Sequence, residues 1–236
     1  MTVSLMPVPS RRRGEEILDR PGLDPRIIRR ALADVAKANA FLGGTAAVLA
    51  ELETVARELP REATLLDVAT GNGDIPRSAR KFLLEEHGIG LTTIGLDSAE
   101  TLARVSKTNL HAVVRANALR LPFPSRSVDV ITCSQFLHHL DAGEAATLVG
   151  EMNRVARIRV VISDLRRSWI AAGGLWVASF PLRFDPVSRY DGVLSVMRGF
   201  TREELHEIVA QAIGAAASVK HRRGFRITAS WTPVVT

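Results

Sequence analysis

Two hydrophobic patterns follow one another along the chain. In the first 60 residues, apolar positions recur at a spacing of three and four, which is typical of amphipathic helices. Asp24 followed by proline is a favourable start for a helix, and we predict that this helix ends at Gly43 or Gly44. A second helix is predicted from about Thr45 to Leu59, before a proline.

Beyond residue 60, short runs rich in β-branched residues alternate with helical patterns. The predicted strands are residues 64–69, 91–97, 111–116, 128–134 and 158–164. The predicted helices are residues 75–88, 98–109, 141–156 and 201–214, and residues 217–231 are predicted to form a closing hairpin. Such alternation predicts an α/β fold with a largely parallel sheet, to which the hairpin adds one antiparallel strand.

The first predicted strand runs into a glycine-rich loop, Asp67 to Asp74. In an open α/β sheet, ligands bind beyond the carboxyl ends of the strands, and Gly71 and Gly73 let the backbone approach a ligand without Cβ clashes. Asp97 ends the next predicted strand, 24 residues after Gly73. This is near the spacing of about 20 for a carboxylate that binds ribose hydroxyls. The loop and Asp97 together predict a nucleoside site.

The residues around the loop narrow the choice of nucleoside. A dinucleotide-binding loop has a third glycine where this chain has Pro76, and the Gly-Lys-Ser/Thr end of a Walker loop is absent. Asp67 precedes the glycines, where a carboxylate repels pyrophosphate but can receive a cationic amine. A ligand with an adenosine, an ammonium and a sulfonium therefore fits better than one with phosphates.

These residues resemble those of class I S-adenosylmethionine-dependent methyltransferases, nearest to the ubiquinone/menaquinone-biosynthesis type and related small-molecule methyltransferases. The usual first motif, Asp/Glu-x-Gly-x-Gly-x-Gly, corresponds here to "DVATGNG", in which Ala69 replaces the first glycine. The resemblance covers residues 61–165 and includes the long stretch 115–140. It implies a Rossmann-like sheet of seven mostly parallel strands with one antiparallel edge strand and an N-terminal helical cap.

The resemblance also implies a domain organisation and a cofactor. Residues 1–60 would form an N-terminal arm and helical cap, and residues 61–236 the S-adenosyl-L-methionine-binding domain, with an insert or lid at 166–200. Asp97 would bind the ribose, and Asn117 would face the adenine edge. The residues expected to bind the cofactor are Asp67, Ala69, Thr70, Gly71, Asn72, Gly73, Asp97, Ser98, Asn117, Ala118, Leu119, Ser134 and Gln135. The alternative is that Asp67, Asp97 and Asn117 only cap turns or helices.

His138 and His139 follow the fourth predicted strand, where the cofactor's methyl group should point. We expect one of them, with His139 favoured, to act as a general base for a phenol or enol. The alternative is that one packs under the loop and the other is solvated. Adjacent residues in a turn point in different directions, so at most one is expected to reach the acceptor. The sequence shows no His/Asp/Glu cluster at ligand spacing, so no metal is expected.

The insert carries six aromatic residues between positions 169 and 200, among glycines and prolines. A long segment of this composition is typical of a wall or lid over a substrate. The alternative is a hydrophobic dimer surface, and we expect a monomer or a homodimer.

Composition adds few constraints. The 236 residues carry a formal net charge of +6, which permits nucleic acid as a partner, but the arginines are scattered outside the segment 220–226. Cys133 is the only cysteine, so no intrachain disulfide can form, and it is expected to be a small core residue. No apolar run reaches the roughly 18–20 residues of a membrane span, and no signal peptide is recognisable. These features favour a cytoplasmic protein.

We therefore expect an enzyme that transfers a methyl group from S-adenosylmethionine to an oxygen or carbon of a small, largely apolar acceptor. The acceptor would be aromatic, quinol-like or polyketide-like. An RNA methyltransferase is favoured only by the basic charge. A protein that binds the cofactor without catalysis and uses the aromatic insert to contact a partner is the other alternative.

Overall fold

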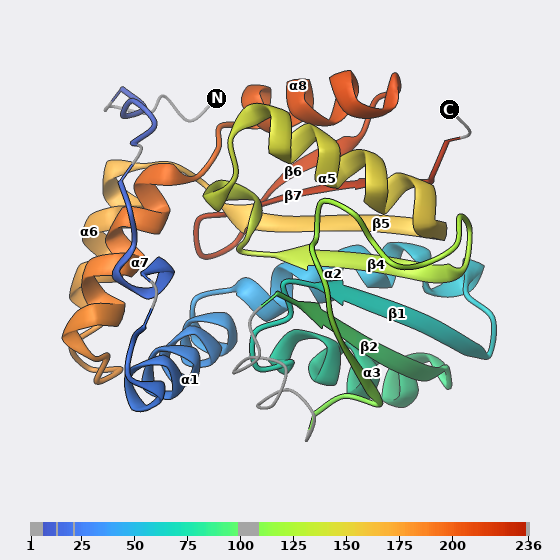
Figure 1. Cartoon of the computed structure of the whole chain (residues 1–236), viewed down its shortest axis with the longest axis horizontal. Coiled ribbons are helices and arrows are strands. Elements are labelled where there is room, and N and C mark those ends of the chain that lie inside the picture. Colours follow the sequence, from blue (N-terminus) through green and yellow to red (C-terminus); the bar gives the residue numbers. More distant parts are fainter. Residues whose placement is uncertain (1–6, 13, 21, 99–108, 235–236) are drawn as a thin grey trace.

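The computed structural model describes residues 7–12, 14–20, 22–98 and 109–234. Their strands form one seven-stranded sheet in the order β3-β2-β1-β4-β5-β7-β6 (Figure 1). The strands are β1 Glu62–Val68, β2 Gly90–Asp97, β3 Ala112–Arg115, β4 Val128–Ser134, β5 Ala156–Leu165, β6 Ser218–Arg222 and β7 Arg226–Trp231. The first five are parallel, and β7 is antiparallel to both β5 and β6. The predicted fold class is confirmed, with the antiparallel strand one position in from the edge.

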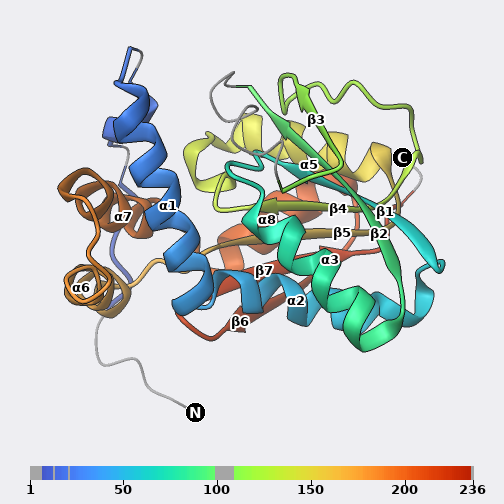
Figure 2. The same ribbon diagram turned by 90° about the horizontal axis from the view of Figure 1, so that it is seen from below.

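Helices cover both faces of the sheet and one of its ends. In Figures 1 and 2, α2 and α3 lie on one face and α5 and α8 on the other, while α1, α6 and α7 lie beyond the carboxyl ends of the parallel strands. The α-helices are α1 Pro25–Phe41, α2 Gly44–Val55, α3 Asp74–His87, α5 Ala142–Val155, α6 Trp169–Ala178, α7 Pro186–Arg198 and α8 Arg202–Ile213. Within the described ranges, the 3-10 helices are η1 Ile17–Asp19, η2 Ala56–Glu58 and η3 Leu137–His139. A helix was expected over residues 98–109, but all of these except 98 and 109 lie outside the described residues.

Local sequence signals account for several of these boundaries. The Asp24 carboxylate accepts a hydrogen bond from the backbone N–H of Arg26 and so begins α1. Asp141 with Glu144, and Thr201 with Glu204, form reciprocal capping boxes at the starts of α5 and α8. Each capping box satisfies backbone N–H groups that the first turn of a helix leaves without partners.

The core lies in two layers, one on each side of the sheet. Leu66 and Ile162 pack with α5 and α8 on one side, whereas Leu65 and Val130 pack with α2 and α3 on the other. Cys133 on β4 belongs to the first layer and is buried. Successive residues of a strand point to opposite faces, so β1 and β4, which are covered on both faces, are buried along most of their length.

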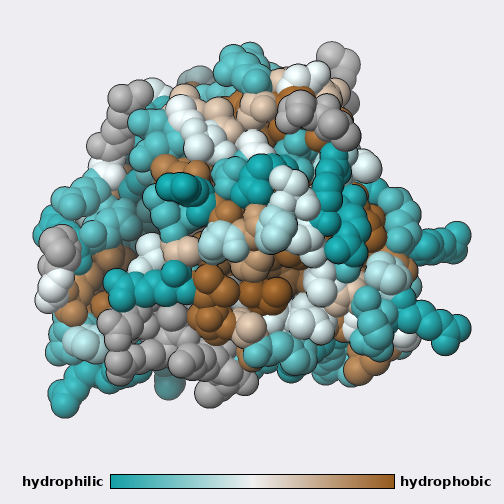
Figure 3. Space-filling model, turned by 45° about the vertical axis from the view of Figure 1, so that its right-hand side comes forward, coloured by the Kyte–Doolittle hydropathy of each residue, from teal (hydrophilic) through white to brown (hydrophobic). Residues whose placement is uncertain are grey.

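The insert forms two helices, α6 and α7, which pack against each other at the end of the sheet (Figure 2). The N-terminal segment is attached to α7, because the backbone N–H groups of Ile17 and Leu18 donate to the Asp191 carboxylate. The outer side of α6 exposes Trp176 and Val177. On the face shown in Figure 3, most side chains are hydrophilic, and apolar ones gather near its centre.

None of the helices in the described part of the chain is long and apolar enough to cross a membrane.

Candidate active site

The glycine loop joins β1 to α3 in a conformation that side chains rarely adopt. Ala69, Gly71 and Gly73 all have φ between 56° and 73°, the left-handed region that favours glycine. The loop is attached to the end of β2, because the Thr70 N–H donates to the Leu96 carbonyl and the Gly71 N–H to the Asp97 carboxylate, 3.3 Å away. The structure thus brings Asp97 beside the loop, as the sequence predicted.

The space over the loop suits a bound ligand. A Cβ atom built at Gly71 would meet only one described atom within 4 Å, a methyl carbon of Leu32 at 3.7 Å. At Gly73 the corresponding atom would meet Leu110 at 3.0 Å. With respect to the described residues, Gly71 therefore borders open space, while Gly73 is needed for close packing. This geometry fits a ligand that approaches the backbone at Gly71.

Asp67 lies beneath the loop and is fully buried. Its Oδ1 accepts a hydrogen bond of 2.6 Å from the Thr132 hydroxyl on the neighbouring strand. Burial raises the pKa of Asp67 to about 7, although the hydrogen bond from Thr132 opposes the shift. Since Asp67 is poised to change its charge near neutral pH, a cationic ligand group can bind it in the ionised form.

Other residues predicted to bind the cofactor lie at the ends of the neighbouring strands. Ser98 and Asn117 are exposed, and the Asn117 side-chain oxygen accepts from the Leu119 N–H, which closes a turn. Ala118 is buried in the core layer beside α5. The side-chain oxygen of Asn117 takes part in this turn, and its NH₂ group does not.

Ser134 and Gln135 follow β4, the strand beside β1. The Ser134 hydroxyl is buried and has no hydrogen-bond partner among the described residues, so a ligand that bonds it satisfies an orphaned group. Gln135 has a φ of 54°, and its amide donates to Asn39 on α1 and accepts from Arg226 on β7. Asn39 in turn bonds Asp74 at the start of α3. These contacts join the glycine loop to the space beyond β4.

That space is a cavity of about 430 Å³ under α1, α6 and α7. Its walls are mostly apolar and include Val35, Leu42, Leu175, Phe184 and Phe225. Polar groups converge at one side, where Glu16, His138 and His139 line the cavity. An apolar pocket with a few convergent polar groups is typical of a small-molecule site.

His138 is held by a buried carboxylate. Its Nδ1 lies 2.7 Å from Asp164 Oδ1, and its backbone N–H donates to the other oxygen of Asp164. Its Nε2 is buried and has no hydrogen-bond partner in the described chain. Burial lowers the pKa of His138, but the charge and hydrogen bond of Asp164 and the nearby Glu16 outweigh it and raise the pKa to about 9. The same contacts hold the pKa of Asp164 below its usual value, against the effect of burial.

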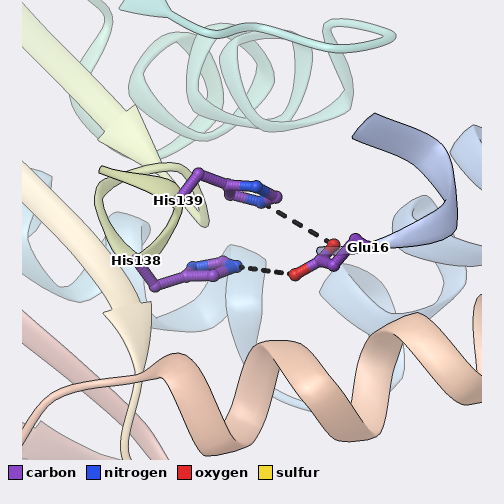
Figure 4. Close-up of side chains that lie close together, drawn as sticks. All are labelled: Glu16, His138 and His139. Carbon is purple, nitrogen blue, oxygen red and sulfur yellow. Dashed lines mark ion pairs between the residues drawn. The ribbon is translucent and has the colours of Figure 1, made fainter. Parts of the chain in front are cut away.

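His138 and His139, at successive positions of η3, both face the carboxylate of Glu16. Figure 4 shows both rings directed toward Glu16, with Nε2 of His138 3.7 Å from one oxygen and Nε2 of His139 3.8 Å from the other. The ring centroids are 4.3 Å apart, and His139 Nδ1 lies 3.2 Å from Asp19. Both histidines line the cavity, because the 3-10 turn lays the two rings side by side, and the expectation that at most one of them reaches the acceptor stays a prediction.

Two arginines fix the backbone of this turn. Arg198 of α7 donates to the carbonyls of His138 and His139, and Arg11 donates to the carbonyls of His138 and Leu140. Arg198 also lies 3.6 Å from Glu16. The N-terminal segment and the insert therefore both hold the histidine turn in place.

Glu16 is a site residue that the sequence analysis missed. Together, Glu16, His138 and His139 offer three potential metal-ligand atoms within 4.8 Å of one another, a cluster that the spacing along the sequence did not indicate. The cluster joins residues far apart in the sequence, so the spacing could not reveal it, and the expectation that no metal is needed stays a prediction. Asp164 was missed as well, although it stands near the carboxyl end of a central strand, the same signal that identified Asp97.

Comparisons with known proteins agree with this geometry. Residues 66–162 match the family model described as "Methyltransferase domain". Residues 66–162 are therefore a methyltransferase domain. No curated protein sequence matches the chain.

Solved structures show the same fold around this methyltransferase domain. A methyltransferase dependent on S-adenosylmethionine from Aquifex aeolicus is 20% identical, with a TM-score of 0.57, and the match covers 90% of this chain and 100% of that chain. Magnesium protoporphyrin IX methyltransferase from Synechocystis, solved with bound S-adenosylmethionine, is 12% identical, with a TM-score of 0.53 and coverage of 92% and 88%. The pyocyanin biosynthetic protein PhzM is 19% identical, with a TM-score of 0.52 and coverage of 78% and 54%. At 20% identity or below, these likenesses show the shared fold, and the methyltransferase domain implies S-adenosylmethionine as the cofactor.

Proposed function

We propose that this methyltransferase acts on a hydroxyl oxygen of a small, largely apolar acceptor, such as a phenol or enol, bound under α1, α6 and α7. One observation carries the proposal: His138 lines an apolar cavity of about 430 Å³, and its buried Nε2 has no hydrogen-bond partner among the described residues. Proteins of similar fold whose names indicate small-molecule chemistry, the protoporphyrin methyltransferase and the pyocyanin biosynthetic protein, support it.

The cofactor would be held by residues at the ends of β1, β2 and β4. Asp97 would bind the ribose hydroxyls, Gly71 would allow close approach of the backbone, and Asp67 would face the positively charged end directly or through water. When bound, the cofactor supplies a methyl group on a positively charged sulfur, and its transfer breaks the carbon–sulfur bond as the carbon–oxygen bond forms. The protein's own contribution is alignment of the acceptor oxygen with that methyl group.

The acceptor would be held by the apolar walls and oriented by the histidine turn. Leu175, Phe184 and Phe225 would contact its ring and exclude water from one side of the oxygen. Because the walls are mostly apolar, a planar acceptor can place its hydroxyl group at His138 while its apolar part contacts these walls.

His138 Nε2 would accept the hydroxyl proton as the methyl group is transferred. Asp164 on Nδ1 holds the ring in position and stabilises the imidazolium that results. The pKa of about 9 for His138 is close to the value of about 10 for a phenol, so proton transfer between them is nearly balanced. His138 therefore replaces His139 as the residue that we assign to the base, while His139 lines the same side of the cavity.

A transfer screen tests this function. Wild-type protein is incubated with S-adenosylmethionine labelled in its methyl group and with a panel of phenols, enols and total RNA. We expect label in one or more small acceptors and none in RNA. Label in RNA alone would support an RNA methyltransferase, and cofactor binding without transfer to any acceptor would support a non-catalytic role.

A further inference from the structure

Arg226 is buried in the wall of the acceptor cavity without a carboxylate partner. It begins β7, is 3% exposed and lines the cavity. Its Nε donates to the Leu42 carbonyl at 3.3 Å and its Nη1 to the Gln135 side-chain oxygen at 2.7 Å. Both partners are neutral, and no ion pair joins Arg226 to an acid in the described part of the chain. A buried arginine is almost always paired with an opposite charge, so this environment is unusual.

Two other buried arginines of the chain show the usual arrangement. Arg167 is held by both oxygens of Glu204, at 2.6 and 3.0 Å. Arg198 lies 3.6 Å from Glu16 and 3.4 Å from Asp19. Burial lowers the pKa of Arg226 to about 10, with only the charge of Asp164 opposing the shift. Arg226 is therefore still charged at neutral pH, in a place that is unfavourable for an unpaired charge.

The position of Arg226 suits a ligand rather than a structural partner. The guanidinium uses Nε and Nη1 for neutral acceptors, and no described group accepts from its Nη2. Nη2 is not among the buried side-chain atoms that lack a partner, so it is open to the cavity that Arg226 lines. Through Gln135 and Asn39, Arg226 is also connected to Asp74 beside the glycine loop. Two side chains thus separate Arg226 from the residue that begins α3 after the glycine loop.

We propose that Arg226 binds the carboxylate of a ligand in this cavity. The inference rests on the proposed function and specifies one ligand group further. A guanidinium presents paired N–H donors that match a carboxylate, and such charge-assisted bonds are stronger inside a protein than in water. Two ligands could supply the carboxylate: the cofactor through its amino-acid part, or an acceptor that is itself an aromatic acid.

Calorimetric binding to Arg226→Met and Arg226→Lys separates these sources. The first pair of probes is S-adenosylhomocysteine and its decarboxylated form, which keeps the amine. The second pair is 4-hydroxybenzoate and phenol, titrated into protein saturated with S-adenosylhomocysteine. We expect Arg226→Met to weaken the carboxylate-bearing member of one pair by about tenfold or more, and its carboxylate-free partner by less than about twofold. Arg226→Lys, which keeps the charge, should retain part of the preference.

The identity of the affected pair names the ligand. Loss on the adenosine pair assigns Arg226 to the cofactor carboxylate, and loss on the phenol pair assigns it to an acidic acceptor. For each pair, the measured quantity is the ratio of the affinities for the members with and without the carboxylate. If this ratio is the same in wild type and Arg226→Met for both pairs, the proposal is wrong. Wild-type protein that binds neither adenosine ligand would contradict the proposed function itself, which is a different result.

Thermal unfolding without ligand provides a second readout. Removing a buried charge that has no partner should leave the melting temperature of Arg226→Met equal to or above that of the wild type. Arg167→Met is the matched control: it leaves Glu204 without its partner, and we expect it to lower the melting temperature and to leave the carboxylate preference unchanged. A melting temperature lowered in Arg226→Met as much as in Arg167→Met, with unchanged binding preferences, would show a structural role.

Discussion

The imidazole of His138 and the carboxylate of Asp164 form a buried pair, with Nδ1 and Oδ1 2.7 Å apart. The pair links the turn after β4 to the carboxyl end of β5, and leaves the opposite ring nitrogen, Nε2, directed toward Glu16 at the side of the cavity that both residues line. Because Asp164 also accepts from the backbone N–H groups of His138 and Leu165, its position is fixed by the sheet. A group in such a position is suited to proton transfer.

His138→Ala should lower the rate of methyl transfer by roughly 10²–10⁴-fold, because it removes the group that accepts the acceptor proton. Cofactor affinity should stay within about twofold of wild type, since His138 is not part of the glycine loop. His139→Ala is the matched control and should have a smaller effect on the rate. Turnover numbers and cofactor binding are measured for both variants. A large rate loss in His139→Ala with a normal rate in His138→Ala would restore the assignment that the sequence favoured.

The rate should increase with pH as His138 loses its proton. Asp164 and Glu16 stabilise the imidazolium and so raise the pKa to about 9, and the form that accepts a proton predominates only above that value. Glu16→Gln removes one of these charges, so the midpoint of the pH–rate profile should move to lower pH. Glu58→Gln, which alters an exposed pair with Arg159, is the control. An unchanged midpoint in Glu16→Gln would contradict the role given to Glu16.

The parts of the site that local sequence determines were predictable. The glycine loop, Asp97 and the helix caps depend on residues near one another in the chain, where turn and cap preferences act. Asp67 and Asp97 could be placed together because the carboxyl ends of neighbouring parallel strands lie at one edge.

The parts of the site that long-range packing determines were not predictable. Glu16 precedes any predicted element, and only the attachment of the N-terminal segment to α7 brings it to His138. The sequences of α6 and α7 show no clear helical period of apolar residues, and α6 is apolar on nearly all sides. The composition of the insert therefore indicated a lid but did not predict its two helices. In the sequence, Arg226 belongs to the basic segment 220–226 of a predicted hairpin. Its burial depends on contacts with Leu42 and Gln135, which come from distant segments.

Asp97→Ala should weaken S-adenosylmethionine binding at least about tenfold, because each charge-assisted hydrogen bond to a ribose hydroxyl contributes roughly 1.5–3 kcal/mol. Gly71→Val should also prevent binding, since it places a β-branched side chain in the left-handed region and in the open space over the loop. Both are measured by calorimetry. Asp129→Ala, which removes a buried acid that pairs with Arg157, should leave the affinity unchanged. Wild-type affinity in Asp97→Ala would remove Asp97 from the cofactor site.

Chelation of divalent metal ions should leave the rate unchanged, although Glu16, His138 and His139 could supply three ligand atoms. Arg198 already lies beside Glu16, 3.6 Å away, and its charge opposes a cation at the same carboxylate. The test is turnover after dialysis against a chelator, and again after adding back zinc, manganese or magnesium. A rate that falls on chelation and returns with one metal would show that the cluster is a metal site.

Cofactor binding should release a proton near pH 6, because Asp67 is protonated in the free protein and ionised when a cationic ligand group lies nearby. Burial raises the pKa of Asp67 to about 7, and a positive charge favours the carboxylate. The measurement is calorimetry at pH 6 in buffers with different ionisation enthalpies. In Asp67→Asn, which cannot lose a proton, the release should disappear and the affinity should fall. Asp129→Asn, on the adjacent β4, is the matched control and should retain the release.

The same shift predicts a change in stability with pH. The folded-state pKa of Asp67 lies above the ordinary value of 3.8, so its contribution to stability is fully present below that value and is lost as the pH rises through about 7. Asn is neutral throughout. The melting temperature of Asp67→Asn relative to wild type should therefore be higher at pH 8 than at pH 5, in protein without ligand. A difference that stays constant between the two pH values would mean that Asp67 is already ionised in the folded protein at pH 5, and proton release on binding would then also be absent.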